Sequence, residues 1–192
     1  HPYFGFDEKP FLAPASIERK TEGKEVLFYV MVSLLILFGL LRQLFPKYFA
    51  DMFRLVFRTT LKQRQIREQL IQTPLPGLML NIFYVLVAGF YIGLVLDHFR
   101  MNPFDNLWIL VVYCCLGVAV IYFVKYLGLK FSGWLFNAEE AADSYIFIIF
   151  MINKMLGVML LPFLLLLAFT TGDLYSASLT ISWVVAAGLL VY

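Results

Sequence analysis

Long runs of apolar residues, separated by short polar stretches, dominate the chain from residue 26 to its end. A helix of about 20 consecutive apolar residues crosses a bilayer, so we expect each run to be a transmembrane helix. The expected spans cover residues 26–44, 78–96, 107–125, 145–169 and 179–192. The first run is short for a bilayer crossing, and it can cross the membrane if the charged end of Arg42 extends into the interface. The pattern predicts an all-α fold, a polytopic transmembrane helix bundle of about five spans.

Residues 46–72 have a different pattern, with apolar side chains at helical spacing and basic side chains between them. The basic residues are Lys47, Arg54, Arg58, Lys62, Arg64 and Arg67. We expect an amphipathic cytoplasmic helix between the first and second spans. Either its apolar face lies on the leaflet and its cations contact anionic lipid headgroups, or it extends into the cytoplasm and contacts a protein partner. Its second half is largely polar, and we expect that half to leave the membrane.

The distribution of Lys and Arg predicts the orientation. Nine of these residues lie in the polar segments on the side of the basic helix, and five lie on the side of residues 1–25. Segments rich in Lys and Arg remain in the cytoplasm, so residues 1–25 are expected to form an extracytoplasmic arm before a transmembrane domain of residues 26–192. Basic residues beside a span are an ordinary topology signal, and we expect no nucleic-acid partner. The last residues are still apolar, so we expect the protein to continue beyond Tyr192.

The composition supports lipid as the solvent of this chain. Hydrophobic residues make up 61% of it and charged residues 15%, and the mean hydropathy is +0.81, whereas soluble domains are about 45–50% apolar and about 25% charged. Two adjacent cysteines, Cys114 and Cys115, lie within an apolar run, and we interpret them as small packing residues. The sequence contains no recognisable catalytic set or metal-binding motif. We therefore expect no catalytic residues, no bound metal and no cofactor.

Lys154 follows Asn153 near the middle of the fourth span. A charge at this depth costs at least ~2.5–3.5 kcal/mol, so the ammonium must face protein or water. One hypothesis gives Lys154 and Asn153 an anion, proton or substrate site. The other gives them a structural tie to another helix or to a second subunit. Acidic residues of the chain are expected only near the ends of the spans, which leaves the partner of Lys154 open.

Small residues at a four-residue spacing predict close helix packing. The second span contains Gly89 and Gly93, and the fifth contains Ser178, Ser182 and Ala186. The pattern does not distinguish packing within the chain from packing between chains.

Two further segments predict helix ends. Thr73-Pro74-Leu75-Pro76-Gly77 is expected to break the helix before the second span. Asn137 is expected to cap the fourth helix, with Glu140 completing a capping box.

Two stretches of sequence resemble a known family. Residues 41–49 (LRQLFPKYF), followed by the basic helix, and residues 153–162 (NKMLGVMLLP) resemble an uncharacterised family of integral membrane proteins of the Bacteroidota, a domain of unknown function. The resemblance implies an inner-membrane location in a Gram-negative cell. It implies no activity and no site residues.

These observations lead to two functional hypotheses. The first is a non-catalytic accessory or scaffold subunit of a bacterial inner-membrane complex, with other membrane subunits as partners. The alternative is a small transporter or lipid-handling protein in which Lys154 and Asn153 line an anion or headgroup site. An enzyme is the third choice, since no nucleophile and base are paired.

Overall fold

The computed structural model describes residues 24–57, 70, 74–104 and 106–191. The elements in this part of the chain are helices: α1 (Lys24–Leu44), α2 (Pro46–Phe57), α4 (Pro74–His98), α5 (Leu107–Leu135), α6 (Glu139–Phe169) and α7 (Asp173–Val191). The predicted all-α bundle is confirmed. Within the expected cytoplasmic helix 46–72, residues 58–69 and 71–73 lie outside the described residues, as does almost all of the N-terminal arm.

Within the described residues, four helices are long and apolar enough to cross a membrane: Glu25–Leu44, Pro74–His98, Leu107–Leu135 and Glu139–Phe169. The chain is therefore a membrane-spanning protein by the length and composition of its helices. The apolar helix Asp173–Leu189 is shorter, and a fifth crossing remains a prediction.

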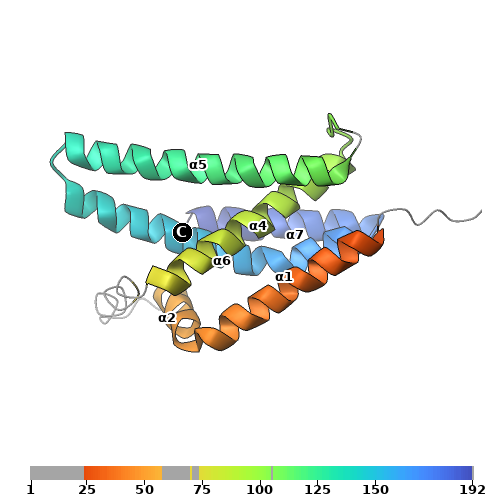
Figure 1. The fold of residues 1–192 in the computed structure, drawn as a ribbon, viewed down its shortest axis with the longest axis horizontal. Coiled ribbons are helices and arrows are strands. Elements are labelled where there is room, and N and C mark those ends of the chain that lie inside the picture. Colours follow the sequence, from red (N-terminus) through yellow and green to blue (C-terminus); the bar gives the residue numbers. More distant parts are fainter. Residues whose placement is uncertain (1–23, 58–69, 71–73, 105, 192) are drawn as a thin grey trace, which may run out of the picture.

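The helices α4 and α6 form the centre of the bundle (Figure 1). α4 contacts α1, α5 and α6, while α6 also contacts α2, α5 and α7. The rings of Phe28 and Phe169 lie 6.3 Å apart, which places the start of α1 beside the end of α6. α2 and the α5–α6 turn lie at the opposite end of the molecule (Figure 1). The bundle thus has two ends, and α2 lies at one of them.

The core lies where α1, α2, α4 and α6 meet. Met31, Met52, Phe83 and Met155 have at most 1% of their surface exposed. By contrast, α5 leaves large apolar side chains such as Ile121 exposed, and such a surface is suited to contact with lipid. The bundle therefore has a central pair of helices and a more peripheral α5.

Two helix starts differ from the sequence prediction. α4 begins at Pro74, not after Gly77, because a proline in the first helical turn loses no hydrogen bond that the turn would otherwise make. α7 begins at Asp173, six residues before the expected start at residue 179. Gly172, with a φ of 73°, makes the turn before it.

The prediction that Asn137 caps α6 is wrong. The N-cap of α6 is Ala138, and no side chain caps it. Asn137 has a φ of 51° and ends α5, because its N–H donates to Trp134 O while the N–H of Ala138 donates to Gly133 O. These two bonds define a Schellman motif, in which Asn accepts the left-handed conformation more readily than most residues.

Candidate functional site

Lys154 lies in the middle of α6, and its ammonium group is buried in the bundle. The residue is 8% exposed, and its Nζ donates a hydrogen bond to the Tyr48 hydroxyl at 3.1 Å. Nζ also lies 5.7 Å from the centre of the Tyr48 ring, within the range of a cation–π contact. Lys154 thus joins α6 to α2 within the same chain.

The amphipathic pattern of α2 explains how Tyr48 reaches this position. Tyr48, Phe49 and Met52 recur at helical spacing and are buried, and the ring of Phe49 packs edge-on against Phe38 of α1. Lys47 and Arg54 lie on the exposed face of α2. Burial raises the pKa of Tyr48 to about 12, so the phenol stays neutral near neutral pH.

Among the described residues, no carboxylate lies within 4 Å of Lys154 Nζ, and the ion pair found there joins Lys130 to Asp143 on the exposed α5–α6 hairpin. Asp51 follows Tyr48 by three residues and is 8% exposed, but it forms no such pair with Lys154. An ammonium group carries three donors, and the neutral phenol accepts one of them. The described part of the chain therefore leaves this cation without a counter-ion.

The start of α4 adjoins the Lys154–Tyr48 pair. A Cβ atom on Gly77 would lie 3.3 Å from Lys154 Nζ and 3.4 Å from the Tyr48 hydroxyl oxygen. The absence of a side chain at Gly77 therefore leaves the two polar groups facing the first turn of α4. The N–H groups of a first helical turn have no partner within the helix, and this end of a helix carries a partial positive charge.

A second polar group lies one turn further along α4. The hydroxyl of Tyr122 on α5 donates to Asn81 Oδ1 at 3.2 Å, and Asn153 of α6 lies beside the same hydroxyl. The Tyr122 ring also contacts Phe150, with 4.3 Å between ring centres. Asn81, Tyr122 and Asn153 thus bring polar side chains from three helices together at one level of the bundle.

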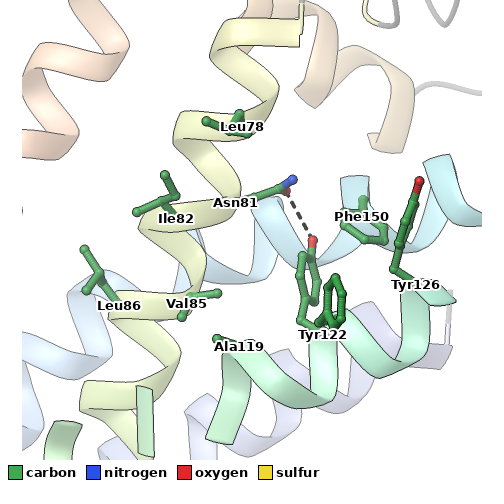
Figure 2. A pocket seen from close by; sticks show the side chains of 10 residues that line it. Leu78, Asn81, Ile82, Val85, Leu86, Ala119, Tyr122, Tyr126 and Phe150 are labelled. Atoms are coloured by element: carbon green, nitrogen blue, oxygen red, sulfur yellow. Dashed lines mark hydrogen bonds between the residues drawn. The ribbon is translucent and has the colours of Figure 1, made fainter. Parts of the chain in front are cut away.

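An apolar groove of about 530 Å³ opens beside this group. It is lined by Leu78, Asn81, Ile82, Val85 and Leu86 of α4, by Ala119, Tyr122, Phe123 and Tyr126 of α5, and by Phe150 of α6. Figure 2 shows the Asn81–Tyr122 hydrogen bond between the two walls, with apolar side chains along α4. The groove combines a long apolar surface with the polar Asn81–Tyr122 pair, and Leu78, which lines it, follows Gly77 in the chain.

The predicted packing residues lie at contacts within the chain. A Cβ on Gly89 would collide with Cys115 of α5, and one on Gly93 would lie 2.9 Å from Val111. Ser182 is fully buried, and its hydroxyl lies 2.5 Å from that of Tyr91.

The remaining members of the second packing set face the interior as well. Ser178 is buried, and Ala186 packs partly buried against the core.

The structure brings together some of the predicted site residues and not others. Lys154 belongs to the pair with Tyr48, and Asn153 belongs to the neighbouring Asn81–Tyr122 group, whereas Lys47 and Arg54 lie on the exposed face of α2. The other basic residues of the segment, Arg58, Lys62, Arg64 and Arg67, lie outside the described residues. No cluster of metal-binding side chains is found in the described ranges of the chain.

Sequence reasoning missed Tyr48, Gly77, Asn81 and Tyr122. Asn81 was visible as a polar residue within an expected span, and such residues in spans tend to find partners. Tyr48 was visible on the apolar face of an amphipathic helix. Gly77 and Tyr122 carried no comparable signal, since their roles depend on which helices become neighbours.

Comparison with known proteins identifies a family. A family model described as "Domain of unknown function (DUF4271)" matches residues 27–192. No curated protein and no solved structure matches the chain.

Proposed function

The chain belongs to the DUF4271 family, and we propose that it is a non-catalytic membrane protein that binds a lipid-like amphiphile in the α4–α5 groove. The single observation that carries this proposal is the apolar groove with the Asn81–Tyr122 pair on its wall. Its volume of about 530 Å³ lies within the range of about 300–1,000 Å³ that is usual for ligand pockets.

The lining of the groove indicates the kind of ligand. Leu78, Ile82, Val85 and Leu86 form an apolar wall, which favours a hydrocarbon chain. The polar Asn81–Tyr122 pair suits an oxygen-bearing group on that chain. Of the two activities suggested by an intramembrane lysine, transport and lipid handling, this lining favours lipid handling.

The test is to fill the groove. Ala119→Trp places a large ring between the walls, and binding of a photo-crosslinkable oleyl alcohol by the protein in nanodiscs is expected to fall on the order of tenfold. Crosslinks in the native protein are expected on the α4 and α5 lining residues. The matched control is Val120→Trp, because Val120 is adjacent on α5 but 59% exposed and outside the groove. Equal loss in both variants, or no loss in either, would reject the proposal.

An accessory-subunit function is a second candidate, favoured by the α5–α6 hairpin. α5 has 29 residues and is about 43 Å long at about 1.5 Å per residue, whereas the hydrocarbon core is about 30 Å thick. Phe131, Trp134 and Phe136 are at least 61% exposed at its end. We propose that these aromatic side chains contact another subunit of an inner-membrane complex.

Co-purification in mild detergent tests this second function. A complex larger than the single chain is expected from native membranes, and Trp134→Ser is expected to dissociate it. Trp183→Ser is the control, since Trp183 on α7 is similarly exposed, at 62%. A chain that always purifies alone, or a complex that survives Trp134→Ser, would exclude the hairpin as the contact.

We also propose that the protein lies in the inner membrane of a Gram-negative bacterium of the Bacteroidota, with its N-terminus outside. The excess of Lys and Arg on the side of α2 supports this orientation. The sequence resemblance of residues 41–49 and 153–162 supports the location.

A further inference from the structure

We infer that the ligand of the α4–α5 groove is an anionic amphiphile whose carboxylate or phosphate head binds at Lys154, Tyr48 and the first turn of α4. This inference rests on the proposed function, because it assigns the head group of the molecule whose chain fills the groove. It identifies a site at Gly77 that is separate from the apolar lining.

The first support is the unsatisfied charge of Lys154. Its ammonium is 8% exposed, and within the described ranges it has one hydrogen-bond acceptor, the neutral phenol of Tyr48. A buried cation is stabilised by an opposite charge that also fills its remaining donor positions. An anionic head group supplies both, since each oxygen accepts hydrogen bonds.

The second support is the set of donors around the same point. Tyr48 accepts from Lys154, so its own hydroxyl proton remains to be donated. The first turn of α4 has one unpaired backbone N–H among its described residues, that of Leu75, because Pro74 and Pro76 have no N–H. An ammonium, a phenol and a backbone amide at the positive end of a helix together favour an anion.

The third support is the route between the site and the groove. Leu78 lines the groove and directly follows Gly77, the residue nearest the Lys154–Tyr48 pair. In this inference the head group contacts Lys154 and Tyr48 beside Gly77, and its chain extends from Leu78 toward Leu86. The Asn81–Tyr122 pair then lies beside the part of the chain next to the head.

The test compares two probes that share a chain and differ in their heads. Binding of oleate and of oleyl alcohol to the full-length protein in nanodiscs is measured by native mass spectrometry, above the pH at which oleate ionises. Oleate is expected to bind on the order of tenfold more tightly than the alcohol. Lys154→Gln is expected to remove this preference, chiefly through weaker binding of oleate. Equal binding of the two probes to the native protein would overturn the inference.

A second variant keeps the test informative if Lys154→Gln fails to fold. Gly77→Val fills the space next to Lys154 Nζ and is expected to reduce the preference for oleate. Gly39→Val on α1 is its control, because a Cβ at Gly39 meets no atom within 4 Å. A preference for oleate that persists in folded Gly77→Val protein would place the head group elsewhere and overturn the inference.

Competition with inorganic phosphate distinguishes a site for a lipid head group from a site for a free anion. Millimolar phosphate is expected to leave oleate bound, because the chain contributes to oleate binding alone. Displacement of oleate, with the alcohol unaffected, would assign the site to a free anion and overturn the inference. The proposed function fails separately, if Ala119→Trp leaves alcohol binding intact.

Discussion

At the scale of single residues, the Lys154–Tyr48 contact shows what can be read from an intramembrane charge. Lys154 and Asn153 stood out in the sequence because charged and amide groups are rare within apolar runs. Their surroundings could not be derived, since Tyr48 lies 106 positions away along the chain. The amphipathic pattern of residues 46–57 predicts a helix with an apolar face, but it does not identify the helix that this face meets.

Tyr48→Phe tests how much the contact stabilises the fold. The variant keeps the ring and removes the one acceptor of Lys154 Nζ in the described structure. Hydrogen bonds to charged groups contribute about 1.5–3 kcal/mol, and we expect a loss of this size in the free energy of unfolding, measured by denaturant titration in detergent. Tyr145→Phe is the control, because Tyr145 is 56% exposed on α6. Equal losses in the two variants would show that the contact contributes nothing specific.

The Asn81–Tyr122 hydrogen bond gives a second prediction at this scale. A double-mutant cycle with Asn81→Leu and Tyr122→Phe is expected to give a coupling energy of about 0.6 kcal/mol, the average for hydrogen bonds between membrane helices. The same unfolding assay measures it. Additive losses would mean that the two side chains do not stabilise each other, although the groove would retain its polar position.

At the scale of helices, the pattern of apolar residues predicted which segments are helical better than it predicted where each helix begins and ends. The expected spans correspond to α1, α4, α5, α6 and α7, but α4 and α7 start earlier than the pattern suggested. Pro74 explains the early start of α4, and Asn137 explains the wrong cap at the start of α6, because each residue type fits more than one position. A proline can precede a helix or occupy its first turn, and an asparagine can cap one helix or end another.

Packing of α4 on α5 predicts that alanine substitutions at two glycines change the free energy of unfolding in opposite directions. Gly89→Ala places a methyl group against Cys115, and we expect a loss of about 1–3 kcal/mol, as for overpacked cores. Gly117→Ala meets no atom within 4 Å and is expected to stabilise its helix by about 0.5–1 kcal/mol. Both changes are measured as free energies of unfolding in detergent. A loss at Gly117 equal to that at Gly89 would show that the close approach of α4 and α5 is not what requires glycine.

At the scale of the whole molecule, the sequence predicts a membrane bundle because composition alone rules out a soluble surface. It does not predict the groove, because the space between α4 and α5 depends on where the two helices diverge. Gly89 and Gly93 hold them together toward one end, whereas Tyr122 and Phe150 lie between them toward the other. Side-chain size at a few contacts, more than the apolar pattern, therefore determines where a ligand fits.

Orientation in the membrane is the last prediction, and it follows from the arrangement of the helix ends. The α5–α6 turn lies at the same end of the bundle as α2 (Figure 1), and the basic segment predicts that this end is cytoplasmic. In a background with Cys114→Ala and Cys115→Ala, we expect a membrane-impermeant maleimide to label Asn102→Cys in spheroplasts. We expect Glu139→Cys to be labelled only after the inner membrane is permeabilised.

The reverse labelling pattern would show that the protein has the opposite orientation, because Asn102 precedes α5 and Glu139 follows it. It would also place Lys154 and Gly77 toward the outer leaflet, since both lie toward the α2 end of the bundle. An anionic amphiphile would then reach the groove from that leaflet. The labelling experiment therefore decides both the topology and the leaflet from which the proposed ligand enters.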